Sequence, residues 1–537
     1  MNRFGRVTSI ALSTAALAAA CMTAPSVASA TAFIGYDATA RPPQLITTRS
    51  LANPGTGKAS AMISAALKGI ASTESFLGIT ALHKEGFDGK GVHIAIISYE
   101  PIRMADVQRF ASRMSLPPLK LNVIPVDGGV SQQALQTPDG DAEVSLDIDA
   151  VHLAAPDATI DVYEVAQSDL LSIPLSTIAK RNQDQIVTIS YGFPYFEVPP
   201  TEESVEQAWV TKLNQEGTTV FAASGDMPGT KTNVTLNLPS ILPNVVGVGG
   251  AELSVPNNAG TTKQSNWPYS AGGYSEDFAE PFYQNVVNSM PSIPKAAVAN
   301  RMVPDISGPA DQTVATASGT VEGFPIQATT DQGTGVYFIQ GTSLASPFEA
   351  GMFADLEQEI GHPLGNLNPM LYSAIGTNAY LPVAGSLATG GPYTGGSSYN
   401  LLTGLGVPNG KTMGNAIKAY DARLEAAINA DIAATYDEVT AMHQDEMLAH
   451  NASAALAGGS SAAKAQLQAA VKDLNQSYNK LNSDQSAYAS LLGQDIKYQP
   501  NQAPLTSSLI ATLGQSVKML TAKYDAEIKQ GAGPVTH

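Results

Sequence analysis

A serine at the start of a predicted helix is the first residue of this chain that could perform covalent chemistry. Ser343 lies in the segment QGTSLASP (340–347), directly after a buried-strand pattern. The first turn of a helix presents unpaired N–H groups and a positive potential, which favour negative charge developing on a substrate oxygen beside the serine. A helix-capping serine gives the same local pattern. Pro347 is expected in the first turn, where proline is tolerated.

A serine nucleophile needs a general base, and none of the seven histidines is in a suitable context. His93 lies inside a strand pattern and is expected in the core. His152 lies in the middle of a helical pattern, without flanking glycines. The remaining histidines are expected in loops or in the C-terminal tail: His83, His362, His443, His450 and His537.

Two carboxylates offer an alternative base. Glu143 and Asp147 are four residues apart in the helical pattern AEVSLDIDAVHLAA (142–155), so both side chains lie on one face. Two partly buried carboxylates held together share a proton, which raises one pKa and suits proton transfer in acid. A solvated acidic face of a helix has the same spacing.

A third carboxyl group follows another buried strand. Asp226 lies in VFAASGDMPG (220–229), in a turn flanked by glycines. A neutral carboxyl group there could donate a hydrogen bond to a tetrahedral oxyanion, whereas an ionised one would repel it. Aspartate is also a common turn residue without any catalytic role.

Short β-rich runs alternate with helical patterns, which predicts an α/β fold with a mostly parallel sheet covered by helices on both faces. The expected strands are 92–98, 158–165, 186–192, 218–224, 244–250 and 336–340. The expected helices are 104–114, 142–155, 202–215 and 344–360. Residues 31–75 are expected to be poorly ordered or loosely docked, and the regions 251–335 and 385–410 to be Gly-rich loops.

The composition changes after about residue 412. Apolar residues recur at alternating steps of four and three from Leu467 to Leu492, which is typical of a coiled-coil seam. A shorter version runs from Ile428 to Met442, AGGSS (457–461) separates the two, and a third helix is expected over 505–528. The tail is therefore expected to be a helical hairpin or small bundle that could self-associate, or else a loosely helical linker.

The N-terminus predicts secretion. Arg3 and Arg6 precede an apolar stretch that is too short to cross a bilayer, and Ala28-Ser29-Ala30 is a small-residue cleavage site. We expect a signal peptide over 1–30 and an extracellular or periplasmic mature protein. Cys21, the single cysteine, could alternatively carry a lipid. Cleavage after Ala30 would leave no cysteine and no disulfide.

The net charge of −18 argues against nucleic acid and anionic membranes as partners. Without Arg3 and Arg6 it becomes about −20. The small number of Lys and Arg side chains is compatible with a protein that works at acidic pH. It is also compatible with ordinary solubility. No later segment has 18 uncharged apolar residues, so no membrane span is expected.

Taken together and in this order, the acidic pair, the SGD turn and the GTSxxxP helix start resemble the sedolisin family of serine-carboxyl peptidases. The resemblance covers roughly residues 75 to 412. Further matching segments are GKGVHIAII (89–97), EVSLDIDAVHLAAPDATIDVYE (143–164), ISYG (189–192), AGGYSEDFAEPFYQ (271–284), RMVPDIS (301–307) and TGLGVPNG (403–410).

The resemblance implies a subtilisin-like fold and a role for each matched residue. Ser343 would be the nucleophile, Glu143 the general acid and base, and Asp147 its orienting partner. Asp226 and the Ser343 N–H would form the oxyanion hole. Extended protein or peptide substrates would add as a strand along Ser190, Tyr191 and Gly192.

Two departures from the family pattern are visible. Only about 60 residues lie between the expected signal cleavage and the first core strand, which is too short for the usual prosegment. At the family's calcium site, Asn400 stands where an aspartate is usual, and 381–383 contains no acid. Weak or absent calcium binding is therefore expected, and no cofactor is required for the chemistry.

The expected organisation is a signal peptide (1–30), a lead segment (31–75), a sedolisin-like peptidase domain (76–412) and a helical extension (413–537). The protein is expected to be a secreted serine endopeptidase that acts in acid. One alternative is a surface or assembly protein that acts through its helical tail, with the peptidase fold as a scaffold. Another is a self-processing peptidase that cleaves its own tail or lead segment.

Overall fold

The computed structural model describes residues 44–45 and 59–530 with interruptions. The residues it does not describe between these limits are 132–140, 195–197, 199, 228–235, 257–260, 291, 317–318, 331–332, 382, 387–391, 395–398, 459, 461 and 493–506. The expected signal peptide and most of the lead segment lie outside the described residues. Among the helices of the described part, none is long and apolar enough to cross a membrane.

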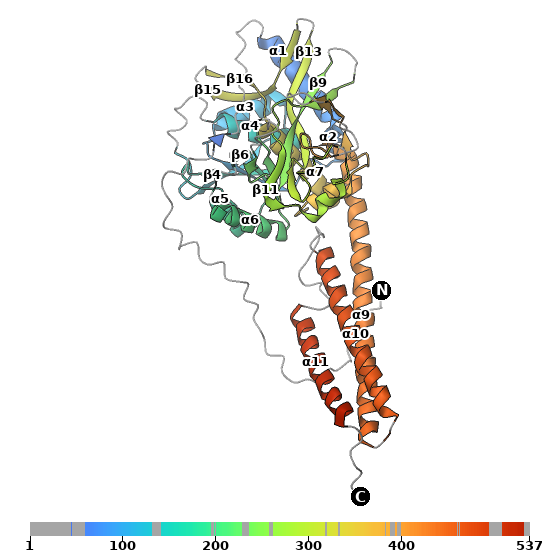
Figure 1. Cartoon of the computed structure of the whole chain (residues 1–537). Helices are drawn as coiled ribbons and strands as arrows, with labels where there is room; N and C mark the ends of the chain where they lie inside the picture. Colours follow the sequence, from blue (N-terminus) through green and yellow to red (C-terminus); the bar gives the residue numbers. More distant parts are fainter. Residues whose placement is uncertain are drawn as a thin grey trace. The chain divides into compact units, whose positions relative to one another are not determined.

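A large, mostly parallel sheet forms the centre of the α/β domain (Figure 1). Its parallel part has the order β3-β4-β2-β5-β7-β9, and β13 adds in parallel to the far side of β9. These strands are β2 (His93–Ser98), β3 (Lys120–Val126), β4 (Thr159–Val165), β5 (Ile186–Ile189), β7 (Thr219–Ala223), β9 (Val246–Val255) and β13 (Ile306–Thr316). Their Val- and Ile-rich sequences are typical of strands covered on both faces, and the expected subtilisin-like class is confirmed.

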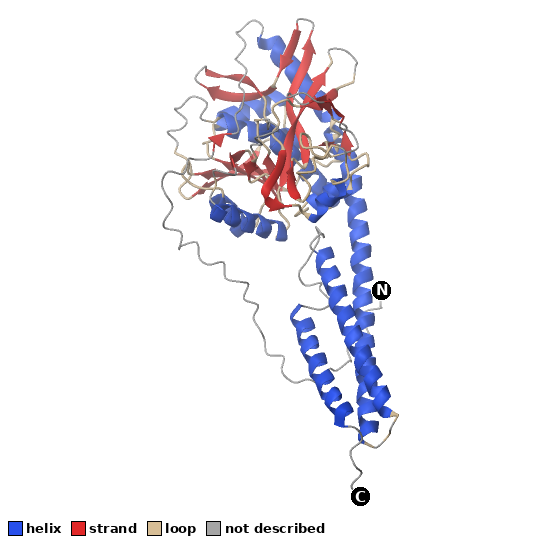
Figure 2. Ribbon diagram, viewed as in Figure 1, coloured by secondary structure: helices blue, strands red, loops and turns tan. Residues whose placement is uncertain are grey.

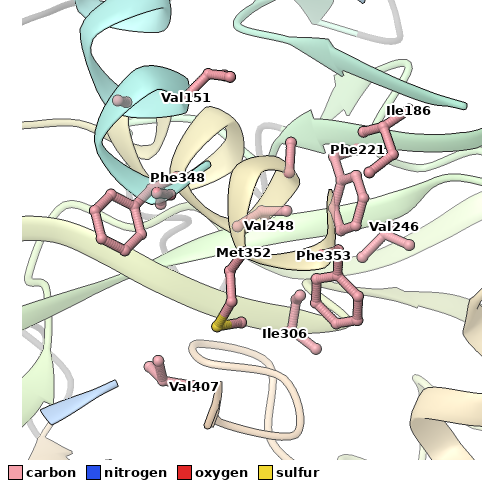
Figure 3. Close-up of a cluster of buried hydrophobic side chains, with 14 of the residues drawn as sticks. Val151, Ile186, Phe221, Val246, Val248, Ile306, Phe348, Met352, Phe353 and Val407 are labelled. Atoms are coloured by element: carbon pink, nitrogen blue, oxygen red, sulfur yellow. The ribbon is translucent and has the colours of Figure 1, made fainter. Parts of the chain in front are cut away.

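Helices cover both faces of this sheet, as the alternating pattern predicted. One face packs against α3 (Met104–Met114), α4 (Ala142–Ala154) and α7 (Thr342–Ile360); the other packs against α5 (Ser172–Arg181) and α6 (Pro200–Gln215). Figure 3 shows Phe348, Met352 and Phe353 of α7 lying among side chains of the central strands. The rings of Phe221 and Phe353 are 5.4 Å apart, which anchors α7 to the sheet.

The region 251–335 is not the loop region that its composition indicated. It contains β10 (Lys263–Asn266), β11 (Gly273–Ala279), β12 (Asn300–Val303), β13, β14 (Gly319–Glu322) and β15 (Phe324–Thr330). The predicted strand 336–340 corresponds to β16 (Gly333–Ile339), which pairs only with β15 and lies outside the parallel sheet. Composition misled here because glycine and proline are tolerated in edge strands and at bulges, and β13, which pairs in parallel with β9, has such an irregularity between Pro309 and Asp311.

The lead segment is more ordered at its C-terminal end than expected. Residues Ala59–Phe76 form α1, followed by α2 (Ile79–Glu85). Ala66 packs with Val314 and Phe338, and Ile70 belongs to the main core. His83 therefore lies on a helix and not in a loop, and its Nε2 is 3.0 Å from Asp355 Oδ2.

The C-terminal tail consists of α9 (Gly410–Ala457), α10 (Ala463–Leu492) and α11 (Ser507–Gln530), and Figure 2 shows it without strands. Four residues of the expected seam are buried between these helices, Leu467, Val471, Leu474 and Leu481, and Tyr478 is partly buried against them. Met413, Ile417, Tyr420 and Leu424 of α9 pack in the main core. The domain boundary at 412 and self-association of the tail stay predictions.

Several carboxyl groups of the α/β domain have a pKa that burial raises well above the usual value for the residue type. They are Glu143, Asp147, Asp149, Glu206, Glu349 and Glu357. In Asp226 and Asp355 the pKa is raised to about 7 and about 8, again mainly by burial. These groups hold protons in the folded protein that the unfolded chain releases above about pH 4.

The free energy of unfolding is therefore expected to fall as pH rises from about 4 through 8. Each such group contributes up to about 1.4 kcal/mol per pH unit between its unfolded and folded pKa. The melting temperature should be highest near about pH 4–5 and lower by roughly 5 °C or more at pH 8. Scanning calorimetry from pH 3 to 8 checks this, and a maximum near neutral pH would contradict it.

Candidate active site

Helix α4 places Glu143 and Asp147 on one face, as their spacing predicted. Both side chains are completely buried. Neither oxygen of Glu143 has a hydrogen bond of standard geometry with a described residue, whereas Asp147 Oδ1 lies 2.7 Å from Ser190 Oγ. The solvated acidic face that was the alternative is excluded by this burial.

Burial and mutual repulsion favour the protonated form of the pair. The pKa of Glu143 is raised well above its usual value, first by burial and then by the nearby Asp147, while the Ser343 hydroxyl beside it lowers the pKa. Burial also raises the pKa of Asp147, against the hydrogen bond from Ser190. One proton held between two carboxyl groups gives an acid and a base within one pair.

The nucleophile candidate is the second residue of α7. Ser343 is buried, and its Oγ makes no hydrogen bond of standard geometry with a described residue. Its N–H lies in the first turn of the helix, where N–H groups have no intrahelical partner. Its hydroxyl is close enough to Glu143 to lower the pKa of that carboxyl group.

Pro347 lies deeper in α7 than expected, and its position has a consequence. It is the sixth residue of the helix, so it lacks the N–H that would bond the Ser343 carbonyl four residues earlier. The Ser190 hydroxyl lies 3.2 Å from that carbonyl oxygen and replaces the missing donor. Ser190 thus connects the backbone of Ser343 with the carboxyl group of Asp147.

Asp226 lies after β7, next to the start of α7. Its Oδ1 accepts hydrogen bonds from the N–H and the hydroxyl of Thr342, at 2.8 and 2.7 Å. Its Oδ2 is buried and has no hydrogen-bond partner among the described residues. Burial raises the pKa of Asp226 to about 7, so in acid a proton resides on Oδ2 and is available for donation. A Cβ atom at Gly341 would lie only 2.8 Å from Oδ2, so this position requires glycine.

Sequence reasoning missed Glu100, which follows β2 on the active-site side of the sheet. Its Oε2 accepts hydrogen bonds from the N–H groups of Glu143 and Val144, at 2.9 and 3.3 Å, and so caps the N-terminus of α4. Its charge also raises the pKa of Glu143 and Asp147. A carboxylate two residues after a buried strand was the available signal.

The predicted substrate strand is present as β6 (Tyr191–Pro194), after Ser190. Residues Gln44–Leu45 of the chain itself form β1 and pair with it antiparallel, Gln44 opposite Gly192 and Leu45 opposite Tyr191. The backbone of β6 can therefore accept an extended peptide. The Ser190 side chain faces Asp147, so its contribution is to position that carboxyl group.

Among the described residues, no histidine hydrogen-bonds Ser343 Oγ. His152 is buried in α4, as expected, and burial lowers its pKa to about 4. The expectation that His93 is a core residue is wrong: its side chain is 36% exposed and contacts Asp161. A histidine at the first residue of a strand can reach solvent beyond the end of the sheet, which the strand pattern alone does not indicate.

The residues at the family's calcium position do not fit that ion well. Asn400 Oδ1 accepts hydrogen bonds from the N–H groups of Leu402 and Thr403, at 2.8 and 3.1 Å. Its Nδ2 donates to Thr403 Oγ1 and to the Gly404 carbonyl. Calcium needs several oxygen ligands with negative charge, and here the amide closes the turn by itself. Parts of this region, including 395–398, lie outside the described residues.

The chain is similar to known proteins over much of the α/β domain. The Subtilase family profile matches residues 137–380. Kumamolisin from Bacillus sp. is 32% identical over 312 residues, which cover 54% of this chain and 52% of kumamolisin. Sedolisin from Pseudomonas sp. is 27% identical over 250 residues, covering 43% and 39%. Tripeptidyl-peptidase sed4 from Aspergillus fumigatus is 25% identical over 379 residues, covering 58% and 60%.

Among solved structures, Pseudomonas sedolisin complexed with pseudo-iodotyrostatin matches with a TM-score of 0.51 and 22% identity. The match covers 62% of this chain and 94% of that one, which supports a shared fold. The chain spans about half the length of the curated relatives it matches.

Proposed function

Since this chain belongs to the sedolisin family of serine-carboxyl peptidases, we propose that it is a serine endopeptidase that hydrolyses peptide bonds in acid. The observation that carries the proposal is the burial of Glu143 and Asp147 beside Ser343. The Glu143 oxygens and Ser343 Oγ make no other standard hydrogen bond with the described residues, so they are available to each other.

The proton transfers follow from this arrangement. Glu143 accepts the proton of Ser343 as the hydroxyl oxygen attacks the scissile carbonyl carbon, and then returns the proton to the leaving amine. Asp147, which accepts a hydrogen bond from the Ser190 hydroxyl, orients Glu143 and shares the proton of the pair with it. Water then repeats the sequence on the acyl-enzyme. Burial raises the pKa of both carboxyl groups, which favours this shared proton.

Two hydrogen-bond donors would stabilise the negative charge on the oxygen of the tetrahedral intermediate. The Ser343 N–H at the start of α7 is one, and the proton on Asp226 Oδ2 is the other. Both lie on elements that pack in the core, so little reorganisation is needed when the oxyanion forms. Ionisation of Asp226, whose pKa burial raises to about 7, would replace the second donor by a negative charge.

Cleavage of a denatured protein at about pH 4, in the acid range that the carboxyl mechanism requires, tests the proposal. Wild type should release peptides, and Ser343→Ala should not. Ser346→Ala is the matched control, because Ser346 lies one turn along the same helix and hydrogen-bonds Thr188. Equal cleavage by wild type and Ser343→Ala would refute the assignment.

Asp226→Ala is expected to lower kcat by about 10²–10³-fold, since it removes one oxyanion donor. Asp226→Asn keeps an acceptor for Thr342 and supplies an amide donor, so it should retain more activity than the alanine variant. Steady-state kinetics on one peptide substrate measure both. Equal losses in the two variants would show that Asp226 does not act as a donor.

Calcium is not expected to bind tightly, because Asn400 satisfies its own turn. Titration of calcium into chelator-treated protein should give no submicromolar affinity, and the melting temperature should not change. Asn400→Asp tests the reason, since it restores the charged ligand. Submicromolar affinity in wild type would overturn this prediction.

A second function, self-processing, is favoured by β1. Its two residues occupy the strand position along β6 where a substrate would add. We propose that the lead segment is itself a substrate. Purified wild type should then be shorter than Ser343→Ala by mass spectrometry, and identical masses would dismiss this function.

The proposed location and partners of the protein rest on its sequence. We propose secretion, directed by residues 1–30, and protein or peptide substrates. Nucleic acid does not fit the net charge of −18. We propose that the helical tail mediates self-association. The alternative function, a surface protein that acts through this tail, would require that the Ser343 site be inactive.

A further inference from the structure

A second group of titratable side chains lies at the other end of the parallel strands, and the proposed peptidase mechanism does not use it. His93 is the first residue of β2, Asp161 lies in β4, and Asp184 precedes β5. One ligand atom from each lies within 4.8 Å of the other two. From His93 to Ser98, β2 extends about 16 Å at roughly 3.3 Å per residue, so the cluster is remote from Ser343.

We propose that His93, Asp161 and Asp184 bind a first-row divalent transition metal ion, with Zn²⁺ as the best fit. An imidazole and two carboxylates are ligands that zinc accepts, and three protein ligands leave a position for water. Calcium prefers six to eight oxygen ligands and is a poor fit.

The ligand atoms already face one another. His93 Nδ1 is 2.8 Å from Asp161 Oδ2. Asp161 and Asp184 are 2% and 3% exposed, so both carboxyl groups are held away from solvent. Asp184 Oδ1 is buried and has no hydrogen-bond partner among the described residues, which leaves a carboxylate lone pair available at the cluster.

Outer contacts hold each aspartate by its other oxygen. Asn122 Nδ2 donates to Asp161 Oδ1 at 2.6 Å. The Tyr163 hydroxyl donates to Asp184 Oδ2 at 2.5 Å and accepts from Arg181 Nε at 3.0 Å. Such contacts orient ligating carboxylates in known metal sites.

The backbone fixes the third ligand. His93 N–H donates to Gln185 Oε1 at 2.7 Å, and the Gln185 N–H donates to the His93 carbonyl at 3.1 Å. The Gln185 carbonyl in turn accepts from Thr219 N–H. The strand beginnings are therefore held in register before any ion arrives, which lowers the cost of ordering the site.

Charge also favours a cation. Asp161 and Asp184 place two carboxyl groups in one buried cluster. A divalent ion would offset the repulsion between the two carboxylates, and the half-exposed His93 gives it a route from solvent. The ion would connect β2, β4 and the segment before β5 in a chain with a single cysteine.

Calorimetric titration of Zn²⁺ into chelator-treated, untagged protein at pH 7 tests the site. The Ser343→Ala background prevents self-cleavage, so the result does not depend on peptidase activity. One equivalent should bind, with Kd of about 1 μM or tighter, and the melting temperature should rise with Zn²⁺. Calcium should have neither effect.

His93→Ala and Asp184→Asn should each weaken binding at least about tenfold and abolish the thermal shift. His362→Ala is the control, because His362 also contacts an aspartate, Asp421, but without a third ligand in the described part of the chain. The metal site would be overturned if Zn²⁺ showed no saturable binding, or if His93→Ala bound Zn²⁺ as tightly as the control. A proton shared between Asp161 and Asp184 would then account for the close approach of the two carboxyl groups.

Discussion

Replacement of Glu143 by glutamine is expected to lower kcat for peptide hydrolysis by about 10⁴-fold or more. Glutamine has nearly the same shape but can neither accept the Ser343 proton nor return it to the leaving amine. The fold should persist, because glutamine fills the same buried space and, as the raised pKa of Glu143 indicates, the site does not stabilise a full negative charge there. Steady-state kinetics and circular dichroism measure the two effects.

Glu349→Gln is the matched control for this experiment. Glu349 is also buried, in α7, and burial also raises its pKa, yet it makes no contact in the proposed mechanism. The control should keep wild-type activity. If Glu143→Gln lost less than about tenfold in kcat, well short of a general base's usual contribution, another group would have to be the base.

Arg301→Met is expected to reduce the free energy of unfolding by roughly 3–5 kcal/mol, because it leaves a buried carboxylate without its partner. Arg301 and Asp305 are completely buried, with Nη1 2.7 Å from Oδ1 and Nη2 2.6 Å from Oδ2. Asp305 also accepts hydrogen bonds from Gly247 N–H and Tyr372 OH, so it cannot move to solvent.

Urea unfolding at pH 7 measures this effect. Lys120→Met is the control, since Lys120 pairs with Asp157 where both side chains reach solvent, and its replacement should change stability by about 1 kcal/mol or less. Replacing both members, Arg301→Met with Asp305→Leu, should recover part of the loss. A loss below about 1 kcal/mol from Arg301→Met alone would show that Asp305 is not held as an ion.

The parts of the fold that follow from local patterns were predictable. Helix α3 has the expected limits 104–114, and α4 differs from its prediction by one residue. Glu143 and Asp147 could be paired because a helix fixes the relation between residues four apart. The proximity of Ser343 to this pair was available only through the family resemblance, since the two helices are far apart in the chain.

Residues that act through long-range contacts could not be predicted. Glu100 caps α4 from a loop after β2, and Ser190 supplies the donor that Pro347 removes. Both depend on the packing of separate elements. β3 was missed because Lys120–Val126 lies at the sheet edge with mixed exposure. The pairing of β1 with β6 joins residues about 147 positions apart, which no local pattern encodes.

The pH dependence of kcat/KM for one peptide substrate tests the central claim most directly. Wild type should be most active at about pH 3–5 and lose activity toward neutrality, where Asp226, whose pKa burial raises to about 7, loses its proton. Ser343→Ala should be inactive throughout. A rate that instead rises from pH 5 to 8 in wild type would indicate a histidine-like base and contradict the carboxyl mechanism.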